Sequence, residues 1–271
     1  MDNFYRQTLL STLLTNMEHL QPLLGTTVML VAHPDDEVIA FAGLMQRMKK
    51  AVVVFATDGA PRDSYFWKEH GSRDNYAEVR RQEARKSLEI VGTQPVFLFD
   101  QVEGGIIDQE LFRRLPEAIK ALEQVLDRIA ADSLLTLAYE GGHPDHDACS
   151  FICRWVAGQR KLPTWESPLY HCNPDGSGVV QVFPQPTGQE VHYSVEGEAL
   201  EKKLEMFHTY KSQKLVLDGF RPEIEQFRPM ADYDFTQRPL PWKLNYELWQ
   251  WPMTGEDVSQ AFASYLGNGN F

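Results

Sequence analysis

The amino-acid sequence predicts an α/β fold, a three-layer sandwich around a mostly parallel sheet. Over the first 158 residues, short apolar runs alternate with segments of helical charge patterning. The apolar runs are nearly continuous, which is typical of parallel strands that helices cover on both faces. With 271 residues, of which 43% are hydrophobic, the chain is long enough to bury a sizeable core. The pattern is that of a Rossmann-like protein.

The expected elements are regular over the first half of the chain. Their boundaries come from β-branched apolar runs and from stop residues such as Gly92. Strands are expected at residues 27–32, 51–56, 95–99 and 134–139, and helices at 37–49, 75–91, 109–130 and 147–158.

The second half is less regular. Prolines separate short strand candidates, a helix follows them, and a segment rich in Pro, Trp and Tyr stays unassigned. The strands are expected at 168–172, 178–183 and 190–195, the helix at 197–211, and the unassigned segment covers 221–255. We expect one domain over residues 1–271, with a core at about 26–158. Residues 159–271 would then extend the sheet and shape the substrate site.

The charge balance excludes several classes of partner. Lys and Arg number 26 against 38 Asp and Glu, which gives a net charge of −12. Such a surface repels phosphate backbones and anionic lipids, so we expect no nucleic-acid partner. No apolar run approaches the ~20 residues of a membrane span, and residues 1–24 lack the features of a secretion signal. Three cysteines suit a reducing cytosol, which predicts a cytoplasmic protein. The oligomeric state is left open, with a homo-oligomer among the options.

Two His-Pro-Asp sequences follow directly after predicted strands. They occupy residues 33–37 (HPDDE) and 143–147 (HPDHD). The carboxyl ends of parallel strands lie at one edge of a sheet, where ligands of such folds bind. A single His-Pro-Asp is more often a turn or a helix start, with Asp as the cap and Pro in the first turn. Its occurrence after two strands of one sheet favours a functional site.

The residue types of these motifs suit a hydrolytic metal site. Zinc in such a site takes three ligands from His, Asp or Glu and leaves a fourth position to water. His33 and Asp36 can point to one side at the turn into a helix, and His146 can supply the third ligand. Water bound there has a pKa of about 7 instead of 15.7 and becomes a nucleophile. Asp35 is then free to take its proton, and His143 to face the developing oxyanion or the leaving group.

A dinucleotide site is the competing chemistry at the first motif. It requires Gly-x-Gly-x-x-Gly after the strand, but His-Pro-Asp-Asp-Glu stands there. Carboxylates at that turn would repel a pyrophosphate, so the sequence favours a hydrolytic metal site over a dinucleotide site.

The two motifs resemble the signature of the LmbE-like, or PIG-L, N-deacetylases. The matching residues are 32–37 (AHPDDE) with Gly43, and 143–146 (HPDH) with Ala148. The resemblance covers about residues 26–158 and extends weakly to residues 208–213 (HTYKSQ). Members of this family are zinc-dependent enzymes that remove an acetyl group from N-acetylglucosaminyl compounds. The resemblance implies the LmbE-like deacetylase fold, zinc or another divalent metal such as iron, and a small-molecule N-acetylated amino-sugar conjugate as substrate.

Carried over by position, the resemblance also implies roles for single residues. The zinc ligands would be His33, Asp36 and His146, and the general base would be Asp35. His143 would be the charged partner of the tetrahedral intermediate. Arg80 matches a family arginine that contacts substrate in some members.

Several residues near the two motifs have a role that the sequence leaves open. Arg80 could instead form a helix-surface ion pair with Glu83. Gly141 stands where some members carry a tyrosine, and Tyr139, four residues before His143, is not assigned that role. Glu140 is an unusual residue at this loop.

In two other segments, aromatic residues could serve either ligand binding or packing. Residues 60–74 form a long connection with Tyr65, Phe66 and Trp67 and could be a binding loop. Three tryptophans, Trp242, Trp249 and Trp251, could stack on a sugar or simply pack a C-terminal extension, which is the commoner use of large aromatics.

The sequence therefore predicts a zinc-dependent hydrolase that acts on linear amide bonds and removes the N-acetyl group of an N-acetylglucosamine-type conjugate. One alternative is a zinc amidase that cleaves a different acyl group or a thiol conjugate. Another is a metal-binding module without catalysis, which the complete set of motif residues argues against.

Overall fold

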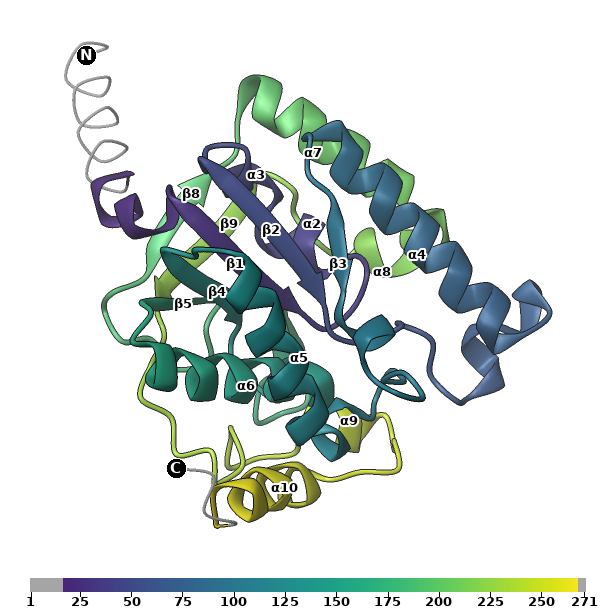
Figure 1. The fold of residues 1–271 in the computed structure, drawn as a ribbon. Coiled ribbons are helices and arrows are strands. Elements are labelled where there is room, and N and C mark those ends of the chain that lie inside the picture. Colours follow the sequence, from purple (N-terminus) through teal and green to yellow (C-terminus); the bar gives the residue numbers. More distant parts are fainter. Residues whose placement is uncertain (1–16, 268–271) are drawn as a thin grey trace.

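A seven-stranded sheet forms the centre of the protein in the computed structural model, which describes residues 17–267 (Figure 1). Its strand order is β3-β2-β1-β4-β5-β9-β8. The first five strands in this order are parallel and the last two pair antiparallel. Their bounds are Thr26–Val31 for β1, Lys50–Phe55 for β2, Pro95–Phe97 for β3, Ser133–Leu137 for β4, Thr164–Ser167 for β5, Val191–Ser194 for β8 and Ile224–Pro229 for β9. The predicted α/β class with a mostly parallel sheet is confirmed.

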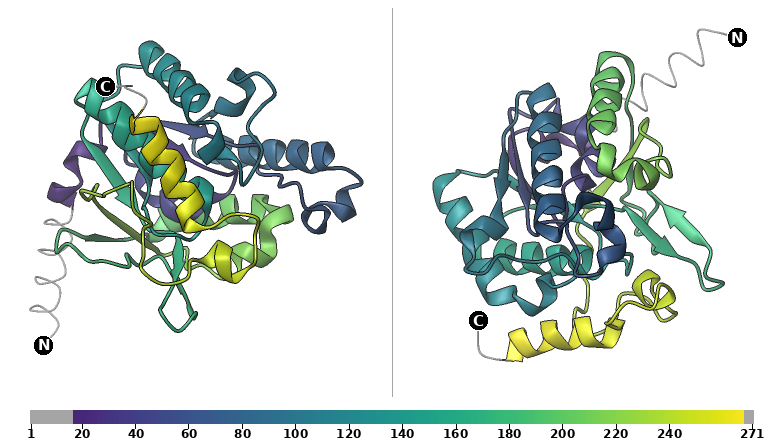
Figure 2. Two further views of the ribbon diagram at one scale, coloured as in Figure 1. Left: turned by 90° about the horizontal axis from the view of Figure 1, so that it is seen from below. Right: turned by 90° about the vertical axis from the view of Figure 1, so that its right-hand side faces the viewer.

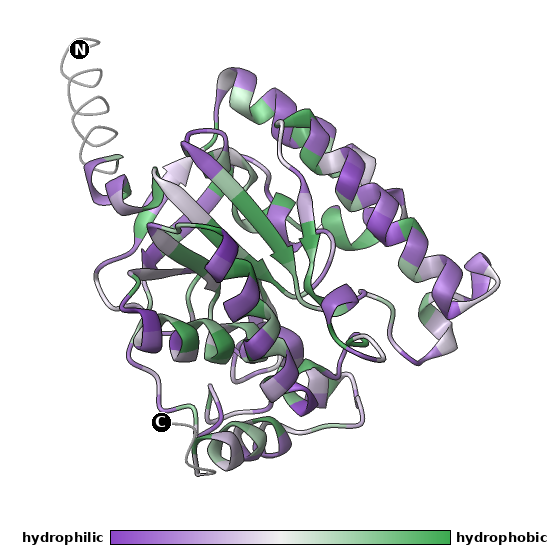
Figure 3. Ribbon diagram, viewed as in Figure 1, coloured by the Kyte–Doolittle hydropathy of each residue, from purple (hydrophilic) through white to green (hydrophobic). Residues whose placement is uncertain are grey.

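Helices cover both faces of this sheet. On one face lie α5 (Leu115–Arg128) and α6 (Pro144–Arg160), and α10 (Gly255–Gly267) packs on the outside of α6 (Figures 1 and 2). On the other face, α4 (Arg73–Ile90) packs against α7 (Gly197–Thr209). Hydropathy follows this arrangement, since the central strands are apolar while the outer sides of α4 and α7 are polar (Figure 3).

The remaining elements are short. A separate hairpin of β6 (Tyr170–Cys172) and β7 (Gly178–Val180) projects from the body of the protein (Figure 2). The short α-helices are α2 (Asp36–Ala40), α3 (Ala42–Met45), α8 (Lys214–Leu217) and α9 (Asn245–Leu248). The 3-10 helices are η1 (Gln21–Leu23), η2 (Ser64–Phe66), η3 (Lys68–His70), η4 (Leu98–Gln101), η5 (Leu111–Arg113) and η6 (Lys211–Gln213).

Two predicted helices differ from the structure. The helix expected at 37–49 is broken at Phe41, where the backbone leaves the helical region (φ −135°), so that α2 and α3 replace it. The helix expected at 109–130 starts only at Leu115, because Gln109 has a positive φ of 72° and Pro116 occupies the first turn of α5. The segment 221–255, which the sequence left unassigned, contains β9 and α9, and α10 starts at its end.

Within residues 17–267, no helix is both long and apolar enough to cross a membrane. Most of the segment 1–24, on which the expectation about secretion rests, lies outside the described residues.

A buried ion pair ties the antiparallel edge of the sheet to the first helices. Lys203 on α7 is fully buried, and its Nζ donates to Oε1 of Glu225 on β9 at 2.6 Å and to the carbonyl of Ile39 at 3.1 Å. Glu225 also accepts the backbone N–H groups of Gly43 (2.6 Å) and Leu44 (2.9 Å), which the break in the predicted helix leaves without helical partners. Glu225 therefore links the buried ion pair to the break between α2 and α3 and stabilises both.

We predict that Lys203→Met lowers the free energy of unfolding by about 3–5 kcal/mol, because the change leaves the buried Glu225 carboxylate without its cation. Urea unfolding monitored by circular dichroism measures this value. The neighbouring Lys202→Met is the control, since Lys202 pairs with Glu198 at the surface (2.9 Å) and its loss should leave stability nearly unchanged. Equal stability of the two variants would contradict the structural role of the buried pair.

Candidate active site

The two His-Pro-Asp motifs meet at the carboxyl edge of the sheet. Because β1 and β4 are parallel neighbours, the turns that follow them lie side by side. The first turn leads into α2 and the second into α6, whose N-cap is His143. A cavity of about 540 Å³ opens over this edge. His33, Asp35, Asp36, Arg80 and His143 line it, and the sixth predicted residue, His146, is buried beside it with 1% exposure.

The three predicted metal ligands form a small triangle of side chains, in which Asp36 turns a different carboxylate oxygen to each histidine. His33 Nδ1 lies 3.5 Å from Asp36 Oδ2 and 3.3 Å from His146 Nε2, and His146 Nε2 lies 3.3 Å from Asp36 Oδ1. A tetrahedral zinc ion with ligand bonds of about 2.0–2.1 Å places its ligands roughly 3.3 Å apart. The spacing of this triangle therefore fits a divalent transition metal.

The other nitrogen of His33 faces two buried carboxylates. His33 Nε2 lies 3.2 Å from Asp108 Oδ1 and 3.4 Å from Asp145 Oδ2. Asp145 is fixed in turn by the backbone N–H groups of Gln109 (2.6 Å) and Leu111 (2.9 Å). Carboxylates at this position hold the proton on Nε2 and leave the lone pair of Nδ1 for a metal, as is usual for ligating histidines.

His143 has the opposite arrangement. Its Nδ1 accepts the backbone N–H of Asp145 at 3.1 Å, so a neutral ring carries its proton on Nε2. That nitrogen lies 3.3 Å from Asp108 Oδ1. Burial lowers the pKa of His143 to about 4. A neutral His143 therefore has Asp108 as the partner of its Nε2 proton, which differs from the charged histidine that the family resemblance implies.

Asp108 is the residue that sequence reasoning missed. It is buried, it lines the cavity, and it lies within ion-pair distance of both His33 and His143. Of the described residues, two overlapping groups place their donor atoms within 4.8 Å of one another: His33, His143 and His146, and His33, Asp108, His143 and Asp145. Both groups include His143 and neither includes the predicted ligand Asp36, because Asp36 turns a different carboxylate oxygen towards His33 and towards His146. Asp108 follows β3 at the same sheet edge, but no motif surrounds it, and only its topological position could have pointed to it.

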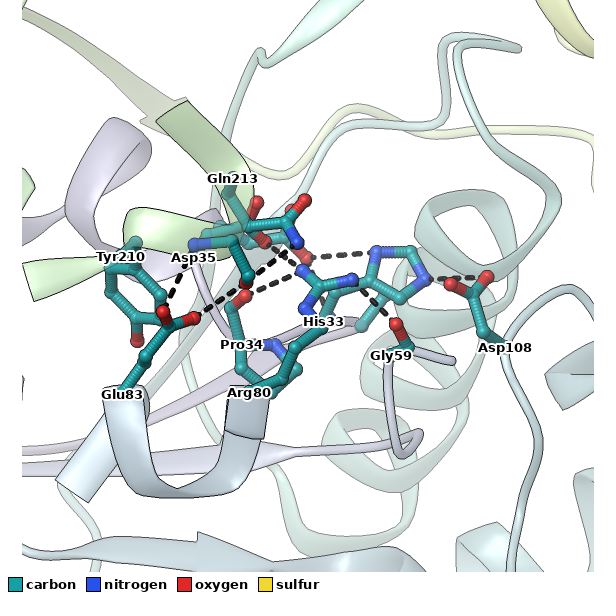
Figure 4. A network of polar contacts seen from close by, with 12 residues as sticks. His33, Pro34, Asp35, Gly59, Arg80, Glu83, Asp108, Tyr210 and Gln213 are labelled. Atoms are coloured by element: carbon teal, nitrogen blue, oxygen red, sulfur yellow. Dashed lines mark hydrogen bonds and ion pairs between the residues drawn. The ribbon is translucent and has the colours of Figure 1, made fainter. Parts of the chain in front are cut away.

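Asp35 is held in a strained conformation beside Arg80. Its φ of 129° is rare for a residue with a side chain and is typical of functional sites. The Arg80 guanidinium donates to Asp35 Oδ1 (2.8 Å) and to the carbonyls of Pro34 and Gly59 (2.6 Å each), as Figure 4 shows. Burial raises the pKa of Asp35 to about 7, although the charge of Arg80 acts against this rise.

The partners of Arg80 exclude one of its two interpretations. Glu83 accepts the hydroxyl (2.6 Å) and the backbone N–H (3.0 Å) of Ser212 instead of a guanidinium. Arg80 is 5% exposed and faces the cavity, so the interpretation of Arg80 as the partner of Glu83 in a helix-surface ion pair is wrong. Contact between Arg80 and substrate stays a prediction.

Glu37 fixes the strained turn from behind. Its Oε2 accepts the backbone N–H of Asp35 at 3.1 Å, and its Oε1 accepts the hydroxyls of Tyr210 (2.6 Å) and Ser87 (3.3 Å). Burial raises the pKa of Glu37 to about 8. Tyr210 comes from the end of α7, so the second half of the chain supports the first motif.

The three unusual residues before His143 have structural roles. Tyr139 points away from the cavity, since its hydroxyl donates to the carbonyl of Gln237 at 2.7 Å. Glu140 is fully buried, and its Oε1 accepts the N–H groups of Leu169 (2.6 Å) and Tyr170 (3.0 Å). A side chain at Gly141 would collide with Leu244, because an added Cβ would lie 2.5 Å from Leu244 Cδ2.

The aromatic segments contribute in part to the cavity. From residues 60–74, Pro61 and Phe66 line it, while Trp67 donates its indole N–H to the carbonyl of Pro61. Trp249 and Trp251 also line it, and the Trp251 ring lies edge-on to His143 with 5.0 Å between centroids. The packing interpretation holds for Trp242, whose indole N–H donates to the carbonyl of Cys172.

Comparison with known proteins identifies a family that matches part of the chain. Residues 28–157 match the family model described as PIG-L, GlcNAc-PI de-N-acetylase. This segment contains all six predicted site residues. A comparison with curated proteins finds no match.

Solved structures share the fold at low sequence identity. A deacetylase of the teicoplanin biosynthetic pathway is 17% identical with a TM-score of 0.60, and the match covers 77% of this chain and 99% of that one. The N,N'-diacetylchitobiose deacetylase from Pyrococcus horikoshii is 19% identical with a TM-score of 0.55, over 85% and 94% of the two chains. A 4-carboxy-2-hydroxymuconate hydratase from Pseudomonas putida is 17% identical with a TM-score of 0.50, over 71% and 82%. Residues 28–157 thus match the PIG-L (LmbE-like) family, and the chain has the fold of LmbE-type deacetylases.

Proposed function

We propose that the protein is a zinc-dependent N-deacetylase that hydrolyses the acetamide of a small-molecule N-acetylglucosamine-type conjugate. The observation that carries this proposal is the triangle of His33, Asp36 and His146 donor atoms beside the buried carboxylate of Asp35. The family description and the deacetylases among the structural neighbours support the same reaction class.

The ligand set follows from the availability of lone pairs. His33 Nδ1, His146 Nε2 and the Asp36 carboxylate face one another, whereas His143 Nδ1 already accepts a backbone N–H and its Nε2 carries the proton. We therefore assign His33, Asp36 and His146 to the metal and leave His143 to the substrate. A divalent ion such as zinc, or iron in its place, would polarise the amide carbonyl and activate a water molecule when bound.

The remaining residues then act on protons and charge. Asp35 takes a proton from the attacking water and returns one to the departing amine nitrogen, so that acetate and a free amine result. The Nε2–H of His143 donates to the carbonyl oxygen as it gains negative charge. Arg80 fixes the Asp35 carboxylate at 2.8 Å and faces the cavity, where we propose that it also contacts substrate.

Two other functions remain in competition. A zinc amidase that cleaves another acyl group or a thiol conjugate would use the same centre, and only the substrate distinguishes it. The fold alone does not decide the reaction, since a hydratase shares it. A binding module without catalysis has no need for the strained, buried Asp35 next to the donor triangle.

We predict about one divalent ion per chain in the purified protein, because one triangle of donors offers one site. Inductively coupled plasma mass spectrometry measures this ratio. His33→Ala should lose most of the metal, whereas His208→Ala, a change at an exposed position on α7, should retain it. An active preparation without a transition metal would overturn the mechanism.

We further predict that the two neighbouring aspartates separate metal binding from proton transfer. Asp36→Ala removes a ligand, so metal content should fall markedly. Asp35→Asn keeps size and polarity but removes the base, so metal should stay while turnover falls by roughly 10²–10⁴. Asn is also among the residues that best tolerate a positive φ, which keeps the strained turn.

Bound metal and release of free amine are measured for both aspartate variants, with the melting temperature as a check on folding. Metal loss in Asp35→Asn together with metal retention in Asp36→Ala would reverse the assignment of the two side chains.

A further inference from the structure

The cavity has two chemically different parts. Its inner end is the centre described above, where the charged lining residues gather. Its outer part is apolar and is built by four separate elements: Phe66 on η2, Val179 and Val180 on the β6–β7 hairpin, Val216 on α8, and Trp249 directly after α9. We call these five residues the outer channel. It is continuous with the catalytic centre, so a molecule with its amide at the metal site extends into it.

The side chains of the outer channel are not part of the core. Phe66 is 38% exposed, Val180 37%, Val216 50% and Trp249 50%. Large apolar side chains exposed in this way, grouped around a cavity mouth, are typical of binding surfaces. The Trp249 ring contacts Tyr170 (6.1 Å between centroids) and Trp251 (5.1 Å), which ties the channel to the residues around His143.

Polar partners for sugar hydroxyls are scarce in this outer part. Among the described lining residues the charged or titratable groups belong to the inner centre, apart from His171 and two tyrosines. Gln213 lines the cavity, but its amide already donates to the hydroxyls of Tyr76 (2.6 Å) and Ser212 (3.0 Å). Asn245 has a free acceptor, because its buried Oδ1 has no hydrogen-bond partner within residues 17–267. A substrate hydroxyl or N–H near the centre would satisfy it.

We infer that the substrate is an uncharged amphiphile: an N-acylated amine whose amide enters the catalytic centre and whose alkyl or aryl group lies along the outer channel. This inference rests on the proposed deacetylase function and specifies its substrate class. The net charge of −12 argues against an anionic tail or an anionic lipid surface as the occupant. The apolar group can belong to the acyl side or to the amine side of the amide, and the experiment distinguishes the two.

The test uses the full-length, metal-loaded protein and two series of compounds. In one, glucosamine carries N-acetyl, N-butanoyl or N-hexanoyl groups. In the other, N-acetylglucosamine carries a methyl, butyl or hexyl aglycone. In one of the series kcat/KM should rise by up to about fourfold per added methylene, the equivalent of ~0.8 kcal/mol.

Val216→Ser and Trp249→Ala should each reduce the ratio of kcat/KM between the longest and the shortest compound of that series. Leu215→Ser is the matched control, because Leu215 neighbours Val216 on α8 but points to solvent (90% exposed) and does not line the cavity.

Binding of the methyl and hexyl aglycones is measured in parallel by isothermal titration calorimetry, so that the result does not depend on turnover. Hydrolysis of all compounds at equal rates, with equal affinities, would refute the channel and leave the deacetylase proposal intact. If no compound is hydrolysed while the hexyl compound still binds more tightly, and Val216→Ser abolishes the difference, the deacetylase proposal fails and the channel stands. A chain-length dependence that the Val216 and Trp249 variants do not change would also overturn the inference.

Discussion

The burial of several carboxylates at one sheet edge is the constraint on which the rest of this site depends. Asp35, Asp36, Asp108 and Asp145 are at most 7% exposed and lie around the ends of β1 and β4. A buried charge is costly unless an opposite charge and hydrogen bonds compensate it. Arg80 and the histidines provide part of this compensation, and burial still raises the pKa of Asp35 to about 7. A divalent cation at the donor triangle would compensate the remaining negative charge, which explains in physical terms why so many carboxylates can be buried here.

The second half of the chain holds this centre in place by hydrogen bonds from a few residues. Tyr210 donates to Glu37 behind the strained turn, and Gln213 and Ser212 bind Tyr76 and Glu83 on α4, the helix that also carries Arg80. These contacts come from the segment at 208–213, whose weak resemblance to the family extends beyond the matched residues 28–157. This segment thus supports the residues around the centre, although it places no side chain among the predicted metal ligands.

The sequence allowed the placement of the motif residues to be predicted, because the motifs fix both residue type and position along the sheet edge. His33, Asp36 and His146 lie together as expected, since strand order and the alternation of strands and helices bring both turns to one edge. Asp108 could not be found in this way, because it lies in an irregular loop more than ten residues after β3 and its role depends on tertiary contacts. The break at Phe41 was equally hidden, since it depends on Glu225, about 180 residues further along the chain.

Only part of the outer channel could be predicted: Phe66 and Trp249 were candidates for binding, whereas Val179, Val180 and Val216 carry no signal in the sequence. The five residues come from a 3-10 helix, a three-residue strand, a single helical turn and the residue after another such turn, and elements this short have no periodic pattern. The channel also has a consequence for the chemistry. Once an apolar substituent fills the channel, water is displaced from the side of the cavity opposite the catalytic residues. Electrostatic interactions strengthen as the local dielectric constant falls, so the hydrogen bond from His143 and the Arg80–Asp35 pair would act more strongly on the bound amide. Substrate recognition and catalysis would then be coupled through the exclusion of water, with the apolar group contributing to the rate although it takes no part in the reaction.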